Sequence, residues 1–244
     1  MIKLFRKTRQ AMIKKNKTGN YLLYAVGEIL LVVVGILIAV QLNNLNESRK
    51  ERNVEIDILQ GIKSDILKDT IDINVNIRGY QGSVKSDSIL IDHLVKKKKL
   101  DNTLPIRLYS AASSDFILIL HNSYFQEAKL KGLSIISNKT LRESISRLYE
   151  FDYKVVLEVE ELESFNHFKL LNNVLSEYLS YTDNRVVLSE TSYKRLYSNE
   201  NVLYKIKQGQ VMKIGLLQVH LNASKAALKV VDSIDKELII LKKE

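Results

Sequence analysis

Residues 21–42 read YLLYAVGEILLVVVGILIAVQL, and this stretch decides the architecture of the chain. It exceeds the roughly 20 helical residues that cross the hydrocarbon core of a bilayer. Residues 29–40 carry no polar side chain, and Tyr21 and Tyr24 stand near one end, where aromatic rings suit the lipid interface. The sequence therefore predicts one transmembrane helix over residues 21–42, surrounded by the lipid bilayer.

A basic tail, residues 1–20, precedes the predicted span. It contains no acidic residue and seven basic ones, which are Lys3, Arg6, Lys7, Arg9, Lys14, Lys15 and Lys17. The positive-inside rule keeps such a tail in the cytoplasm, so we expect residues 43–244 to form an extracytoplasmic domain. The seven bases, with Tyr21 and Tyr24, are expected to fix the orientation and to contact lipid headgroups. Residues 1–15 fit either a basic amphipathic helix on the inner leaflet or a disordered tail, and both remain open.

A cleaved signal peptide is the rival interpretation, because it too joins a basic region to an apolar one. However, the apolar stretch is long, and its exit, Ala39-Val40-Gln41-Leu42, lacks the small-x-small pattern of a cleavage site. A buried core helix would leave the basic tail unexplained. The sequence thus favours an uncleaved signal anchor.

Composition limits the classes of protein that the chain can belong to. Its 244 residues include 37 Lys+Arg and 28 Asp+Glu, a net charge of 37 − 28 = +9. Outside the tail the difference falls to 30 − 28 = +2, so a nucleic-acid-binding surface is not expected. The lack of cysteine excludes disulfides, cysteine nucleophiles and cysteine-ligated zinc. One proline and nine glycines do not suit a turn-rich β-sandwich.

One carboxyl group, that of Glu28, lies inside the predicted span. At such a depth a carboxylate costs about 2–3 kcal/mol on insertion scales. Beside it, Gly27, Leu31, Gly35 and Ala39 recur every four residues, and small residues on one face let membrane helices approach closely. We therefore expect a homo-oligomer, or a contact with another membrane protein, with Glu28 at the contact. The alternative is that Glu28 reaches back to the headgroups and that the glycines have no special role.

Apolar spacing predicts helices through most of the extracytoplasmic domain. A helix is expected over residues 46–78, with a break or bend at Gly79 and Gly82. Residues 71–77 alternate as a strand would, although the lack of a preceding turn signal favours helix. The next helix is expected over residues 83–98, and its predicted apolar face comprises Val84, Ser88, Ile91, Leu94 and Val95.

Three more helices follow in this prediction. They are a buried helix over residues 106–120 after a loop at Pro105, a long helix from Ser137 or Asn138 towards Leu179, and a final helix over residues 201–241. The inner face of the long helix is expected to comprise Leu141, Ile145, Leu148, Tyr149 and Val156. Residues 182–200 are polar and turn-like. We therefore expect an all-α fold in which one N-terminal transmembrane helix precedes an extracytoplasmic bundle of about five or six helices.

Two charged groupings each have a structural and a functional interpretation. The run Lys96–Lys99 fits an anionic-ligand patch, but a solvated helix C-terminus is the commoner role of such a run. Four acids lie close together in the sequence, at Glu158, Glu160, Glu161 and Glu163. Helical spacing spreads them around the axis, which favours an exposed acidic face over a metal site.

A polar corner is expected where residues 121–126 enter a helix. Ser123 and Gln126 have capping-box spacing, and Gly132 fits the far end of the same helix. His121 and Tyr124 would lie at this junction. A weak ligand pocket is conceivable there, but a packed, hydrogen-bonded junction is commoner, because helix ends need polar partners.

Two blocks of sequence carry a resemblance to a known family. Gly27-Glu28-Ile29 through Gly35-Ile36-Leu37-Ile38-Ala39, followed by Gln41, Asn43-Asn44 and Asn46-Glu47, is similar to the signature of uncharacterised, membrane-anchored bacterial proteins, domain of unknown function 6090. The second block, Ser123-Tyr124 to Leu141-Arg142, resembles that family more loosely, and Leu45 stands where many relatives have tryptophan. The resemblance implies one span and a helical domain outside the cytoplasm, in a bacterial inner membrane. It implies no activity, cofactor or catalytic residue.

The sequence predicts a non-enzymatic function. It contains no Walker loop, G-x-G-x-x-G, G-x-S-x-G or H-E-x-x-H motif, and no two of its four histidines have i,i+4 metal spacing. We therefore expect no catalytic residue, cofactor or metal. The leading hypothesis is a membrane-anchored protein-interaction or assembly module outside the cytoplasm. The alternative is a ligand-sensing helical bundle that works with a separate signalling partner.

Overall fold

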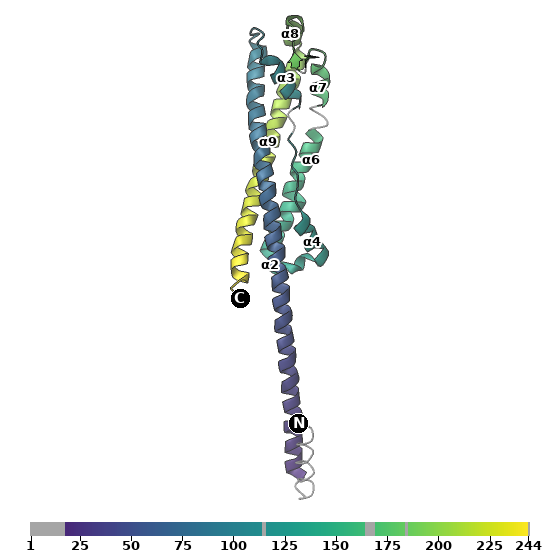
Figure 1. Ribbon diagram of the computed structural model, residues 1–244, viewed down its shortest axis with the longest axis vertical. Helices are drawn as coiled ribbons and strands as arrows, with labels where there is room; N and C mark the ends of the chain where they lie inside the picture. The colour runs from purple at the N-terminus through teal and green to yellow at the C-terminus, as the bar shows by residue number, and fades with distance from the viewer. Residues whose placement is uncertain (1–17, 114–115, 164–168, 184, 244) are drawn as a thin grey trace. The chain divides into compact units, whose positions relative to one another are not determined.

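The computed structural model describes residues 18–113, 116–163, 169–183 and 185–243 (Figure 1). It divides into two compact units, residues 1–54 and residues 55–244. Among the described residues, α-helices dominate and only two short strands occur. The predicted all-α fold is therefore confirmed. The basic tail, Lys3 to Lys17, lies outside the described residues.

Helix α2, Thr18–Val95, supplies the described part of the first unit and opens the second. Within the first unit its apolar side chains face outward: Ile29 is 64% exposed, Leu31 69% and Leu37 61%. Among the described residues α2 alone is long and apolar enough to cross a membrane. A water-soluble helix would bury such side chains against a core, and the predicted span thus has the surface that lipid would cover.

Helix α2 also corrects the predicted break at Gly79 and Gly82, because it continues through both. Residues 71–77 are helical, with Ile73 fully buried and Ile71 68% exposed. Gly79 has a packing role: a Cβ atom there would lie 2.5–2.7 Å from the ring of Phe116. The glycine lets that ring approach the helix closely rather than breaking it.

The remaining elements of the second unit follow α2 in chain order. They are α3 (Leu104–Ser113), α4 (Ser123–Lys131), the 3₁₀ turn η1 (Leu133–Ile135), α5 (Lys139–Arg147), the π-helical turn η2 (Leu148–Asp152), α6 (Tyr153–Glu163), α7 (Lys169–Leu175), β1 (Ser180–Thr182), β2 (Arg185–Val187), α8 (Glu190–Tyr197) and α9 (Glu200–Leu241).

Helix α9 returns antiparallel to α2, as ion pairs between Lys63 and Asp235 and between Lys213 and Asp87 show. Two apolar cores lie along this pair. The first core joins Ile58 to Ile77 of α2 with α4, α5, η2, α6 and the second half of α9. The second core joins Leu90 and Leu94 of α2 with α3, α7, α8 and the start of α9. The final helix is confirmed within one residue of its predicted start.

Several predicted boundaries in the second unit were wrong. The helix expected over residues 106–120 ends at Ser113, and residues 116–122 have no regular structure. Pro105 lies in the first turn of α3 rather than in a loop, a position where its missing N–H has no helical partner to lose. Leu108, Ala111 and Ala112 are buried as predicted, but Ile119, which belongs to the same predicted buried helix, is 67% exposed.

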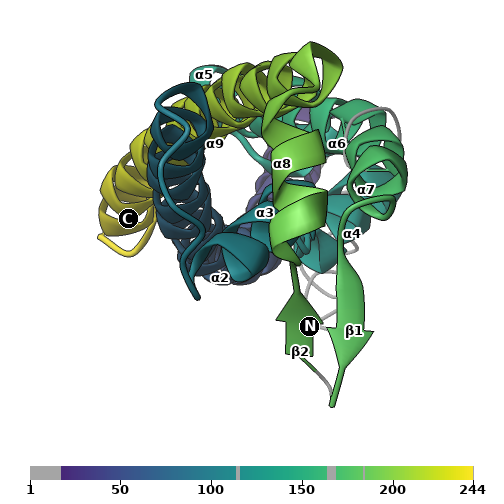
Figure 2. The same cartoon turned by 90° about the horizontal axis from the view of Figure 1, so that it is seen from above.

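The polar stretch 182–200 also holds more structure than predicted. Strands β1 and β2 pair antiparallel, with Tyr181 opposite Val186, and α8 follows them. Figure 2 shows this hairpin projecting away from the helices. Ser189 caps α8 by accepting the Ser192 amide at 3.0 Å. Short capped elements escape a search for long apolar repeats because they contain too few periods.

The middle of the chain matches the prediction in part. Asn138 caps α5 by accepting the Leu141 amide, and the predicted inner face is buried: Leu141, Ile145, Leu148, Tyr149 and Val156. The helix does not reach Leu179, since α7 ends at Leu175. On α2, the predicted face near residue 90 is confirmed at Leu94, which is buried, and at Ile91, which packs partly buried against the second core. Ser88 and Val95 are exposed instead, and the buried face also includes Ser83, Asp87 and Leu90.

Candidate functional site

A row of carboxylates on α2 holds the irregular segment 116–122 and the first turn of α4. Asp72 accepts the Ile119 amide at 2.8 Å, Asp69 accepts the His121 amide at 2.7 Å, and Asp65 accepts the Tyr124 amide at 3.3 Å. As the residue numbers of the amides rise from 119 to 124, those of their acceptors on α2 fall from 72 to 65. The segment therefore runs antiparallel to α2. Buried backbone N–H groups need acceptors, and here side chains replace the missing helix or strand.

His121 and Tyr124 therefore lie where the sequence places them, at a hydrogen-bonded junction. The Nδ1 atom of His121 is 2.9 Å from Asp69, and burial raises the pKa of that carboxyl although His121 works against the change. The ring of Tyr124 packs on Gly61, where a Cβ atom would overlap it. The predicted capping box is wrong, because Asn122 occupies the N-cap position and Ser123 is already helical.

A polar layer separates the two cores, and we define it as Asp87, Glu160, Lys213 and His220. The Lys213 ammonium lies 2.8 Å from Asp87 and 3.1 Å from the Ala111 carbonyl oxygen, and its side chain is 1% exposed. Burial raises the pKa of Asp87, which Lys213 opposes. Burial likewise lowers the pKa of Lys213, which Asp87 opposes. Loss of hydration and mutual attraction thus act against each other within this pair.

Glu160 corrects the predicted exposed acidic face, because it is only 4% exposed. Both of its carboxylate oxygens accept the Leu118 amide at 3.1 Å, and Oε1 lies 2.8 Å from Nε2 of His220. The Nδ1 atom of His220 lies 2.8 Å from the Leu216 carbonyl oxygen. A carbonyl oxygen only accepts, so Nδ1 carries a proton. Glu160 links α6, the irregular segment and α9.

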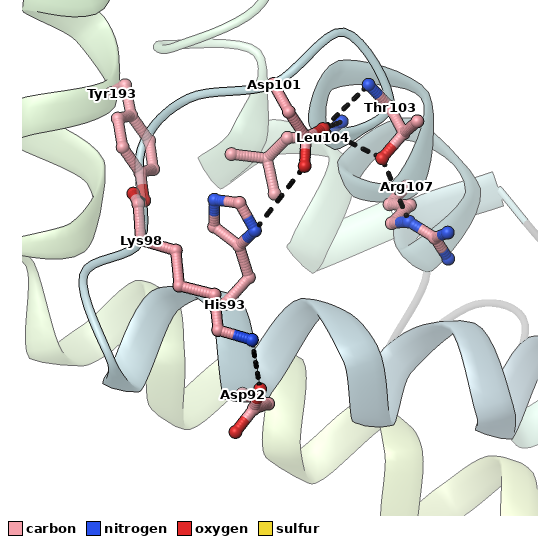
Figure 3. A network of polar contacts seen from close by, with 8 residues as sticks. All are labelled: Asp92, His93, Lys98, Asp101, Thr103, Leu104, Arg107 and Tyr193. Carbon is pink, nitrogen blue, oxygen red and sulfur yellow. Dashed lines mark hydrogen bonds and ion pairs between the residues drawn. The ribbon is translucent and has the colours of Figure 1, made fainter.

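A second polar network closes the end of α2 (Figure 3). Asp92 binds Lys98 at 2.6 Å and also pairs with Lys96, which together hold the pKa of Asp92 at about 2. Asp101 accepts the amides of Thr103 and Leu104 at 2.8 and 2.9 Å. Lys96 to Lys99 are exposed beyond the last residue of α2, so the lysine run follows a helix C-terminus as predicted.

Aromatic side chains hold this end loop against α8. The hydroxyl group of Tyr193 donates to the Lys98 carbonyl oxygen at 2.6 Å, and the His93 ring lies edge-on to Tyr193 at 5.9 Å between centroids. Nδ1 of His93 is also 3.8 Å from Asp101. The loop is thus fixed by its own polar groups and by Tyr193 of α8.

The residues predicted for membrane-helix contact all lie on α2 in the first unit. Gly27, Gly35, Leu31 and Ala39 are exposed, and a Cβ atom at either glycine would meet nothing within 4 Å. Glu28 is half-buried. Tyr21 and Tyr24 belong to the same helix. The face around the two glycines is therefore open.

The polar side chains described above hold helices and loops in position. The polar layer is closed to solvent, with Lys213 and His220 fully buried. Among the described residues, no group of three or more His, Asp or Glu side chains could hold a metal ion. The sequence analysis did not identify Asp87 and Lys213 as buried. A signal existed, because Asp87 shares the apolar repeat of Leu90 and Leu94 on α2, and Lys213 shares that of Leu216 on α9.

Comparisons with known proteins agree with the resemblance in the sequence. No curated protein and no solved structure matches the chain. A family model described as a family of unknown function, DUF6090, matches residues 28–193, which include the carboxylate row, Glu160 and the end loop of α2. Because this match covers more than half of the 244 residues, the chain belongs to the DUF6090 family.

Proposed function

We propose that this chain is a single-pass protein of the bacterial inner membrane that assembles with other proteins outside the cytoplasm and has no enzymatic activity. The observation that carries the proposal is the outward apolar surface of α2 in the first unit. From Val26 to Leu42 its large apolar side chains are 44–69% exposed. A helix that is apolar all round needs lipid or protein around it.

The charge distribution supports the proposed orientation. All seven bases of the tail precede the span, and residues 21–42 contain Glu28 as their only charged residue. Such a bias retains the basic end in the cytoplasm and translocates the other. The second unit would then lie outside the cytoplasm.

The lack of native cysteine permits a clean test of this topology. Thr8→Cys marks the tail, and Ser198→Cys marks an exposed position after α8. A membrane-impermeant maleimide applied to spheroplasts should label Ser198→Cys without lysis and Thr8→Cys only after lysis. The reverse pattern, or labelling of both without lysis, would contradict the orientation. Recovery of the Ser198→Cys variant from the soluble fraction would contradict the anchor.

Assembly is tested by native mass spectrometry of the intact protein, extracted gently from its own membrane. A homo-oligomer or a stoichiometric second protein is expected, and a bare monomer would contradict the proposal. Glu28→Leu should weaken the complex if the carboxyl group lies at the helix contact. Ile36→Leu, which exchanges one apolar side chain for another in the same helix, is the matched control. An unchanged complex in Glu28→Leu would exclude Glu28 from the contact.

A further inference from the structure

An open groove lies between α2 and the C-terminal end of α9 in the second unit. Its volume is about 810 Å³. Leu67 and Ile71 lie one turn apart on the α2 side, and Leu238 and Ile239 line the α9 side. The Lys63–Asp235 ion pair joins the two helices within this groove. The groove therefore belongs to a helix pair that the structure itself fixes.

The apolar lining of the groove is largely uncovered. Ile71 is 68% exposed, Ile239 56% and Leu67 40%, whereas Leu238 is 7% exposed. Neighbouring exposed apolar side chains mark interaction surfaces on proteins. Two antiparallel helices form an elongated trough, and an amphipathic helix fits such a trough with apolar residues at every third or fourth position. A helical occupant thus matches the shape better than a compact small molecule.

The charges around the groove select the kind of helix. Lys63, Lys68 and Lys242 line it against a single acid, Asp235. Lys63 is the partner of Asp235, and Lys68 lies 3.4 Å from Asp65, but the two lysine side chains stay 31% and 54% exposed. The lining therefore carries 3 − 1 = +2 charges. A second copy docked by two-fold symmetry would bring together two surfaces that each carry a net charge of +2, since such a contact pairs a surface with itself.

We propose that the α2–α9 groove binds an amphipathic helix of another protein, one with an aliphatic stripe flanked by Asp and Glu. This inference rests on the proposed assembly function and assigns it a site and a partner chemistry. The aliphatic stripe covers Leu67, Ile71 and Ile239. The acidic flanks meet Lys68 and Lys242 at the rim. Rim charges of this kind act mainly on selection and association rate.

The test uses the full-length protein in lipid nanodiscs and two synthetic helices of equal length. Both carry the same leucine stripe, and one is flanked by glutamate and the other by lysine. Fluorescence anisotropy should show the glutamate helix binding about tenfold or more tightly than the lysine helix. Ile71→Asn should weaken the glutamate helix about tenfold, because it places an amide on the apolar floor. Leu162→Asn, at a 60% exposed position on α6, should not.

Two results would overturn the inference. Equal affinities for the two helices, or binding that Ile71→Asn leaves unchanged, would show that the groove does not select an acidic helix. A dimer of the wild-type chain that Ile71→Asn dissociates would assign the groove to a second copy. If native mass spectrometry finds a second protein that the Ile71→Asn variant still binds, the groove is not its binding site, although the proposed assembly function is supported. A bare monomer in that measurement contradicts the assembly function itself.

Discussion

The apolar cores and the polar layer use the same two helices, α2 and α9, yet they join them by different means. In the first core, Ile62, Ile66 and Ile73 are fully buried among other hydrocarbon side chains. In the polar layer, equally buried positions carry Asp87 and Lys213. Apolar packing tolerates exchange of one hydrocarbon group for another, whereas a buried ion pair demands its specific partner. The layer thus specifies which residues of α2 face which residues of α9.

Breaking the ion pair on one side should produce the largest effect. Lys213→Met leaves the Asp87 carboxylate buried without its cation, and we expect a loss of about 3–5 kcal/mol in the free energy of unfolding. The double variant Asp87→Leu/Lys213→Met should recover most of that loss. Denaturant titration of both variants measures the difference. Equal losses in the single and double variants would mean that the polar layer, like the apolar cores, does not depend on a specific pair of partners.

Truncation of a side chain in the first core should have the next largest effect on the free energy of unfolding. Ile66 is fully buried, so Ile66→Ala should lower the free energy of unfolding by about 3 kcal/mol, within the range for cavity-forming variants. Leu67→Ala, one residue on and 40% exposed, is the control and should lose under about 1 kcal/mol. Similar losses in both variants would mean that α2 buries a different face.

A substitution in the carboxylate row should lower the free energy of unfolding by an intermediate amount. Asp69→Asn weakens the acceptor of the His121 amide and should cost about 1–3 kcal/mol, measured by the same titration. Hydrogen exchange should show faster exchange at His121 and Ile119 than at Ile145 in the first core. Uniform acceleration at all three amides would mean that the irregular segment unfolds only with the whole unit.

Two glycines of α2, Gly79 and Gly82, should give smaller changes in stability, of opposite sign. Gly79→Ala forces a methyl group against the Phe116 ring and should destabilise by about 1–2 kcal/mol after the gain in helix propensity. A Cβ atom on Gly82 meets nothing within 4 Å, so Gly82→Ala should stabilise by up to about 1 kcal/mol. Thermal unfolding of the two variants gives both signs. Stabilisation by both would show that Phe116 moves aside without loss.

The end loop should respond least, and its response is to pH. Lysine contacts hold the pKa of Asp92 at about 2, below its ordinary 3.8. Its stabilising contribution is therefore present above about pH 4 and is lost as the pH falls towards 2. Lys96→Ala/Lys98→Ala should raise the pKa of Asp92 towards 3.8 in carboxyl NMR titration, and Lys97→Ala should not. An Asp92 pKa near 3.8 in the wild type would remove these contacts from the account.

Much of the fold follows from the sequence, because long repeats report which side of a helix is apolar. The apolar stretch 21–42, the final helix and the inner face from Leu141 to Val156 are all legible in this way. The predicted helix over residues 106–120 was wrong at its end, because the apolar run 116–120 has no regular structure. Its amide groups take carboxylate partners more than 40 positions away in the chain. A local sequence pattern cannot predict a hydrogen-bond acceptor that lies so far away in the chain.

The sequence by itself determined the apolar span, the basic tail and the helical class, since each depends on composition and on neighbours along the chain. Only the tertiary structure decided that Glu160 and Lys213 are buried, that Gly79 serves Phe116, and that Ile71 lies exposed in a groove. A charged or apolar residue looks the same in the sequence whether it is buried or exposed. Its role depends on which distant helix packs against it.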